Sequence, residues 1–174
     1  ANGAAVGGAV LPLPRGSGPP GAEVPGLVAT EAWRQVLGGV CQDFSVGRDV
    51  AIVGPAGEGK TAFVRMLAAA LGFRADEVRT LQLFRDMTNR DLVQRRITDG
   101  AGNTLWKDTP LLDAAEHGGL LVLDGLHRLS PDALAAVHGL LFDRDLWLPD
   151  GTHLVSEARF DRLARLGGAG LRRV

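Results

Sequence analysis

Residues 49–61 decide the fold, and they read DVAIVGPAGEGKT. An apolar strand-like run comes first, then a glycine-rich turn, then an amphipathic segment that is typical of a helix ending at Gly72. This order fits the pattern G-x-x-x-x-G-K-[ST], in which backbone N–H groups and the positive end of a helix face phosphate oxygens. The stretch therefore predicts a nucleotide-binding loop. Its members are Gly54, Pro55, Ala56, Gly57, Glu58, Gly59, Lys60 and Thr61.

Three side chains are candidates for the chemistry at the phosphates. Lys60 is predicted to reach the β- and γ-phosphates of ATP, and the Thr61 hydroxyl is predicted to bind Mg²⁺. Asp124 ends the apolar run LLVLD at residues 120–124, and a carboxylate at a strand end can hold Mg²⁺ through its water shell. The predicted catalytic residues are therefore Lys60 and Asp124, and the predicted cofactors are ATP and Mg²⁺. The alternative for Asp124 is that it only caps a turn.

The residue after Asp124 bears on hydrolysis. Many P-loop ATPases have a glutamate there, which orients and deprotonates the attacking water, whereas this chain has Gly125. His127 is the nearest titratable side chain that could replace the glutamate, and the simpler interpretation is a polar residue before a helix. The sequence therefore supports nucleotide binding more strongly than hydrolysis.

Residues 109–151 read TPLLDAAEHGGLLVLDGLHRLSPDALAAVHGLLFDRDLWLPDG. The order of motifs resembles the dynein- and midasin-related class of AAA-plus proteins, which includes the MoxR-like chaperones. The matching positions are Pro110, Leu111, Leu112, Leu123, Asp124, Arg128, residues 141–148, Asp150 and Gly151. The departures from the pattern are Thr109 for glycine, Gly125 for glutamate and His127 for asparagine.

The resemblance implies an α/β P-loop NTPase fold of AAA-plus type, a three-layer sandwich around a parallel sheet of order 5-1-4-3-2. It also implies ATP hydrolysis that drives conformational work, with other AAA modules of the same chain or ring as partners. A narrower likeness, over about residues 28–163 and including RDMTNRDL at 85–92, is to large AAA proteins with a C-terminal von Willebrand factor A domain. Members of that group are mitochondrial, so this likeness implies an intracellular, mitochondrial location.

The chain is expected to divide into three parts. Residues 1–26 are rich in Gly, Ala and Pro and predict a disordered linker, and residues 27–166 predict the AAA-plus core. Residues 167–174 predict a flexible tail, in which Arg172 and Arg173 are expected to be solvated.

Two hairpins are predicted within the core, at about residues 96–106 and 146–155. Their Trp106 and Trp147 are expected to pack on the hairpin bases, and the alternative is contact with a substrate or a neighbouring subunit. Beyond the second hairpin no further apolar strand follows, so the module is expected to be a fragment, truncated before its sensor strand and helical lid. The alternative is a smaller sheet, in which residues 49–53 pair directly with residues 120–124.

The composition argues against several other classes of protein. The formal net charge is −1, without the basic excess that binding to nucleic acid would need, and no apolar run approaches the roughly 20 residues of a membrane helix. Two alternatives to a motor remain, a nucleotide-binding scaffold with little hydrolysis and a nucleoside monophosphate kinase. The kinase is suggested only by LDGLHR at residues 123–128. No residue specifies a protein substrate.

Overall fold

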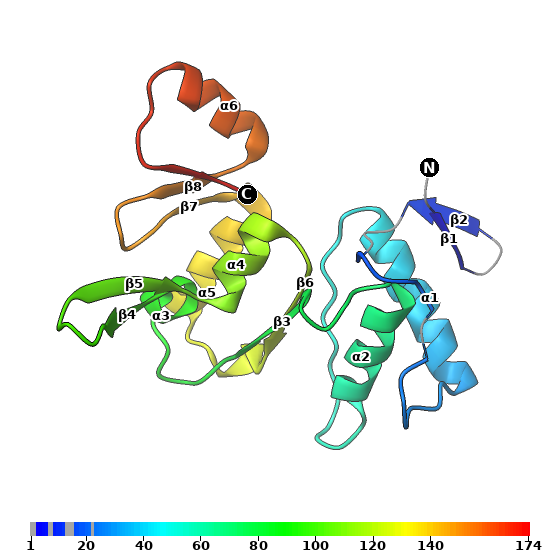
Figure 1. Ribbon diagram of the computed structural model, residues 1–174. Helices are drawn as coiled ribbons and strands as arrows, with labels where there is room; N and C mark the ends of the chain where they lie inside the picture. The colour runs from blue at the N-terminus through cyan, green and yellow to red at the C-terminus, as the bar shows by residue number, and fades with distance from the viewer. Residues whose placement is uncertain (1–2, 7–8, 13–15, 22) are drawn as a thin grey trace. The chain divides into compact units, whose positions relative to one another are not determined.

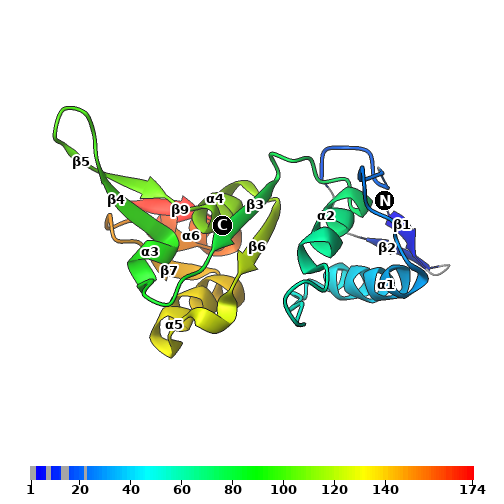
Figure 2. The same cartoon turned by 90° about the horizontal axis from the view of Figure 1, so that it is seen from below.

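The computed structural model describes residues 3–6, 9–12, 16–21 and 23–174. The chain divides into two compact units, Ala1–Val78 and Arg79–Val174, and each is described by itself (Figures 1 and 2). Helices and strands alternate through most of the second unit, which confirms the α/β class. Within the described residues, no helix is both long and apolar enough to cross a lipid bilayer.

Two helices form the core of the first unit, α1 (Glu31–Ser45) and α2 (Lys60–Ala70). The first begins after Thr30, whose hydroxyl accepts a hydrogen bond from the backbone N–H of Trp33 at 3.2 Å. The second ends before Gly72, as the sequence predicts. The two helices share one buried cluster, which consists of Val40, Cys41, Phe63, Leu67 and Leu71.

Some of the described residues in the range 1–26 form regular structure where the sequence predicts a linker. β1 (Gly3–Val6) and β2 (Ala9–Pro12) pair antiparallel, and the Gly16 N–H donates to the Leu71 carbonyl at 3.1 Å. A Cβ on Gly16 would lie 2.2 Å from the Gly72 oxygen, so glycine here allows one backbone to pack on another. The structure therefore corrects the prediction of a disordered linker for these residues of the range 1–26. Residues 1–2, 7–8, 13–15 and 22 lie outside the described residues.

Residues 49–53 do not form the predicted strand. Residues 51–53 are exposed, Val53 to 92%, and within the run Val50 packs against the buried cluster of the first unit. A strand needs a neighbour that pairs with its N–H and C=O groups, and in the described part of the first unit β1 and β2 pair only with each other. The alternative, direct pairing of residues 49–53 with residues 120–124, would join the first unit to the second, and it stays a prediction.

The second unit contains a two-stranded sheet, in which β3 (Val78–Gln82) pairs with β6 (Leu120–Asp124). Their adjacency agrees with the strand order that the resemblance implies for the second and third strands. Residues 120–123 are only half-buried, although their apolar run predicts burial on both faces. The helices of this unit are α3 (Asn89–Val93), α4 (Pro110–His117) and α5 (Pro131–His138), which continues as the π-helix η2 (Gly139–Asp143). The most deeply buried hydrophobic side chains are Leu83, Leu92, Leu111, Leu112, Leu140, Leu154 and Val155.

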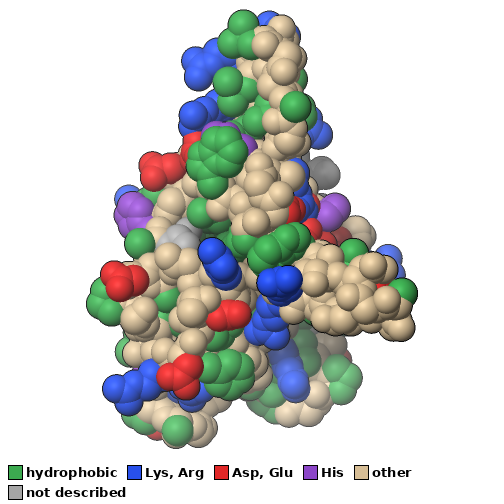
Figure 3. All heavy atoms as spheres, turned by 90° about the vertical axis from the view of Figure 1, so that its left-hand side faces the viewer, with side chains coloured by type: hydrophobic (Ala, Val, Ile, Leu, Met, Phe, Trp, Pro, Cys, Tyr) green, Lys and Arg blue, Asp and Glu red, His purple; other side chains and the backbone are tan. Residues whose placement is uncertain are grey.

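Both predicted hairpins are confirmed. β4 (Gln94–Thr98) pairs antiparallel with β5 (Thr104–Asp108), and β7 (Asp145–Trp147) pairs antiparallel with β8 (His153–Val155). Trp147 stacks on His153 of its own hairpin, with ring centroids 4.1 Å apart, while its side chain stays 68% exposed. On the face that Figure 3 shows, hydrophobic side chains lie scattered among charged ones.

The end of the chain is a strand and not the predicted flexible tail. After α6 (Glu157–Arg165), residues Leu171–Arg173 form β9, which pairs parallel with β8. The structure therefore corrects the prediction for residues 167–174. The sequence gives little sign of this strand, because its three residues include two arginines.

Arg172 is the centre of an ion cluster, which we call the Arg172 cluster: Gln94, Asp108, Glu116, Asp150 and Arg172. Arg172 Nη2 donates to Glu116 Oε2 at 2.6 Å and also to Asp108. Gln94 Nε2 donates to Asp108 and to Asp150, at 2.8 Å each. The expectation that Arg172 is solvated is wrong, because its side chain pairs with these carboxylates. The partners lie far away in the sequence, so the local pattern could not reveal them. Arg173 is solvated as expected, with a side chain 57% exposed.

Candidate phosphate-binding site

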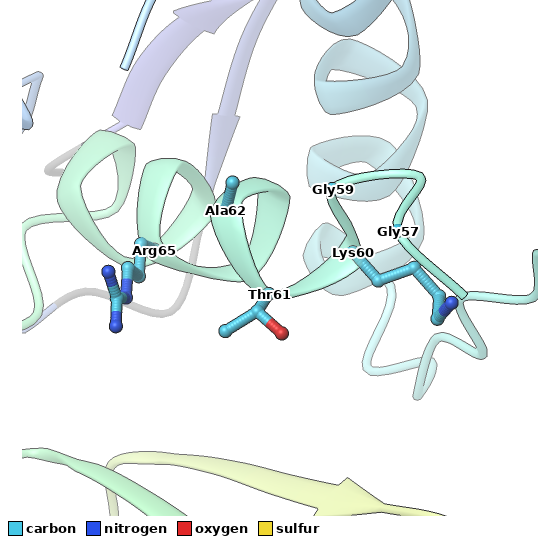
Figure 4. A pocket seen from close by; sticks show the side chains of 6 residues that line it. All are labelled: Gly57, Gly59, Lys60, Thr61, Ala62 and Arg65. Atoms are coloured by element: carbon cyan, nitrogen blue, oxygen red, sulfur yellow. The ribbon is translucent and has the colours of Figure 1, made fainter. Parts of the chain in front are cut away.

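The loop of residues 54–61 curls back on itself where α2 begins. Gly57 and Gly59 have φ angles of 88° and 79°, a backbone conformation that glycine adopts without the strain a Cβ would bring. The Phe63 N–H donates to the Gly59 carbonyl at 2.8 Å and closes the first turn of the helix. A pocket opens at this turn (Figure 4). It is lined by Gly57, Gly59, Lys60, Thr61, Ala62 and Arg65.

The Lys60 ammonium lies in the curl of its own loop. Its Nζ donates to the carbonyl oxygens of Gly54 and Pro55, at 2.8 and 2.6 Å. Among the described residues, no carboxylate lies within ion-pair distance of it. Only neutral carbonyl groups therefore bind the Lys60 ammonium, so its positive charge is not neutralised and can attract an anion.

Two further side chains share the side of α2 on which Lys60 lies. Figure 4 shows Thr61 and Arg65 on that side and Ala62 on the opposite one. Arg65 follows Thr61 by four residues, the spacing that brings two helical side chains to one face. The motif does not include Arg65, but this spacing could have identified it.

The helix itself is fixed by burial of its other face. Phe63, Leu67 and Ala68 are buried, so the exposed face of α2 carries Thr61 and Arg65. The remaining loop residues Pro55, Ala56 and Glu58 are exposed. The structure thus places the predicted residues from Gly54 to Thr61 together around the start of one helix.

Asp124 lies in the second unit, at the last position of β6. Its carboxylate accepts a hydrogen bond from Gln82 Nε2 at 3.1 Å, and its backbone carbonyl accepts one from the Leu83 N–H at 2.8 Å. The side chain is exposed, so the carboxylate keeps acceptor positions free for a cation or water. Gln82 is a neighbour that the sequence analysis missed, because it belongs to the adjacent strand.

The turn after Asp124 requires the glycine that it contains. Gly125 has a φ of 91°, and a Cβ on it would lie 3.0 Å from the Leu83 carbonyl oxygen. A glutamate at this position would therefore be strained by its backbone and crowded by the Leu83 carbonyl, which directly follows β3. His127, the alternative base, is exposed on the short 3-10 helix η1 (Leu126–Arg128).

Two kinds of comparison with known proteins bear on this site. The family model of the AAA domain (dynein-related subfamily) matches residues 49–173, which is more than half of the chain. Von Willebrand factor A domain-containing protein 8 of Mus musculus is 38% identical over 134 residues, which cover 77% of this chain and 7% of that protein.

Two bacterial proteins are also similar over a shorter stretch. The denitrification regulatory protein NirQ of Stutzerimonas stutzeri is 36% identical over 103 residues, 59% of this chain and 36% of that protein. Protein NorQ of Paracoccus denitrificans is 35% identical over 103 residues, 59% of this chain and 37% of that protein. The chain thus spans well under half the length of each of these relatives.

Proposed function

Because the chain belongs to the dynein-related AAA family, we propose that it binds Mg²⁺-ATP through the loop of residues 54–61. An AAA-type ATPase domain implies nucleotide binding, and this assignment replaces the nucleoside monophosphate kinase alternative. The observation that carries the proposal is the Lys60 ammonium, held by two loop carbonyls at the start of α2 and without a carboxylate partner among the described residues. A triphosphate is the kind of anion that such a charge and a helix N-terminus attract.

Each candidate residue then has a role. Lys60 binds the β- and γ-phosphates, and the backbone N–H groups of residues 57–61 donate to phosphate oxygens. Thr61 offers a hydroxyl in the first unit and Asp124 offers a carboxylate oxygen in the second. Both are ligands that Mg²⁺ prefers, and a Mg²⁺ site that they share stays a prediction. Arg65, on the same side of α2 as Thr61, adds a second positive charge to the pocket.

Two outcomes of binding are open to this module. A hydrolysing module would act as a motor with other AAA modules in a ring or in one chain, and the family favours this role. A binding module would use ATP as a structural ligand, and Gly125 favours this second role, because many P-loop ATPases have at this position the glutamate that activates water. The protein substrate is not assigned, and a mitochondrial location stays a prediction from the likeness to the von Willebrand factor A group.

Isothermal titration of the full chain with Mg²⁺-ATP tests the proposal. We expect Lys60→Ala to weaken binding at least about tenfold, roughly 1.4 kcal/mol, because a charged hydrogen bond to phosphate is lost. The matched control is Lys107→Ala, since Lys107 is the other lysine of the chain and lies on β5. Equal affinity of the wild type and Lys60→Ala would disprove the assignment of the loop.

Phosphate release under saturating ATP separates the two roles. Steady turnover that Lys60→Ala abolishes would support the motor. Tight binding without turnover would support the nucleotide-binding scaffold.

A further inference from the structure

The indole of Trp33 lies against the phosphate-binding loop. A Cβ built on Gly59 would be 2.9 Å from Trp33 Cζ2 and 3.1 Å from Cη2. Both distances are shorter than a normal carbon–carbon contact, so the ring occupies the space that any side chain at position 59 would need. Gly59 is therefore confined twice, by its left-handed φ of 79° and by the ring beside it.

The backbone and the indole of Trp33 are each held by a contact. The backbone N–H of Trp33 donates to the Thr30 hydroxyl, which fixes the first turn of α1 and so the position from which the side chain extends. The ring meets Phe63 of α2 edge-on, with centroids 6.0 Å apart and planes at 83°. Phe63 is 6% exposed and belongs to the buried cluster of the first unit, against which Trp33 packs. The ring thus connects the core to the loop.

Gly59 is the point at which this contact can influence binding. Its carbonyl accepts the Phe63 N–H, and the residue after it is Lys60, the first residue of α2. Its backbone torsions therefore set the direction of the next N–H groups and of the Lys60 stem. A loop that is already in its binding conformation loses less entropy when a ligand arrives.

We propose that Trp33 is a positioning residue of the phosphate-binding loop, whose indole supports Gly59 and keeps the loop curled for a nucleotide polyphosphate. This inference rests on the proposed nucleotide binding. Trp33 makes no contact with phosphate in this role. It acts through Gly59, and its own surroundings become more negatively charged when a polyphosphate binds to the curled loop beside it.

Affinity for Mg²⁺-ATP, measured by titration of the full chain, is the first test. We expect Trp33→Ala to weaken binding about five- to tenfold and Trp33→Phe to restore most of it, because phenylalanine keeps an aromatic ring under the loop. The control is Val36→Ala, an exposed residue of the same helix, which should leave the affinity unchanged. Affinity that is the same for Trp33→Ala and wild type would overturn the proposal.

Tryptophan fluorescence supplies a readout that a purely structural role would not change. The chain has three tryptophans, so the double variant Trp106→Phe with Trp147→Phe leaves Trp33 alone. We expect its emission to change with added Mg²⁺-ATP at the concentration that calorimetry gives for binding. This experiment also decides the question if Trp33→Ala does not fold.

The outcomes separate this inference from the proposed function. Binding by calorimetry without any change in Trp33 emission would overturn the role of Trp33 and leave nucleotide binding intact. Absence of binding by the wild-type chain would overturn the proposed function itself.

Discussion

The phosphate-binding loop and the Arg172 cluster each contain a basic side chain, but the groups that hold the positive charge differ between them. Lys60 is held by two backbone carbonyls and has no carboxylate partner among the described residues. Arg172 lies 24% exposed among Asp108, Glu116 and Asp150. A charge whose partners are supplied by the chain stabilises the chain, whereas a charge held by neutral groups keeps most of its attraction for a ligand.

The two regions also differ in how far along the sequence they reach. The loop is assembled from neighbours, and its hydrogen bonds from Lys60 span only five and six residues. The bonds from Arg172 to Glu116 and Asp108 span 56 and 64 residues and join β9 to α4 and β5. Loss of Lys60 should therefore affect binding, and loss of Arg172 should affect folding.

The largest effect on stability is expected from Arg172→Met. It removes the cation and leaves three carboxylates near one another in a partly buried site, which should cost about 3 kcal/mol in the free energy of unfolding. Urea denaturation of the full chain measures this. Arg173→Met is the matched control, since its exposed pair with Glu157 should be worth less than about 1 kcal/mol. Equal losses for the two variants would remove the distinction between the cluster and a surface charge.

Lys60→Ala completes that comparison in the same experiment. Its free energy of unfolding should stay within about 1 kcal/mol of the wild type, because Lys60 makes only exposed hydrogen bonds to carbonyls. A loss as large as that of Arg172→Met would mean that Lys60 is chiefly structural.

The stability of the cluster should also depend on pH. Burial raises the pKa of Asp108 and of Asp150, but hydrogen bonds from Arg172 and Gln94 to Asp108, and from Gln94 and Thr152 to Asp150, outweigh it, so both pKa values are lowered. In the unfolded chain these carboxyls take up protons near pH 4, before they do so in the folded chain. Stability is therefore complete above about pH 5 and falls as the pH drops below 4 toward the folded pKa values.

Urea denaturation between pH 3 and pH 7 checks this dependence. In Arg172→Met the carboxyls lose their main cation, so their folded pKa values rise and the acid loss becomes smaller. An unchanged pH profile in Arg172→Met would show that the acid sensitivity arises elsewhere in the chain.

Local patterns explain what the sequence could predict. The curled loop and the two hairpins depend on residues a few positions apart, and all appear where the pattern places them. Residues 49–53 have the composition of a strand, but composition cannot supply the neighbour with which a strand must pair. Arg172 was expected to be solvated, because only the folded chain brings its carboxylates together. The sequence shows that position 125 is glycine, but only the structure shows that its φ of 91° requires one.

The smallest effect, and the sharpest check on the loop, is expected from Glu58→Gln. Glu58 is exposed within the loop, so its negative charge opposes the approach of a triphosphate without stabilising the fold. Its removal should tighten Mg²⁺-ATP binding about twofold at low ionic strength, because exposed charges interact by only a few tenths of a kcal/mol. The gain should vanish near 1 M salt, where the screening length falls to about 3 Å. Titration at two salt concentrations measures both values, and urea denaturation should show no change. A gain that survives high salt would mean that Glu58 acts through the conformation of the loop and not through its charge.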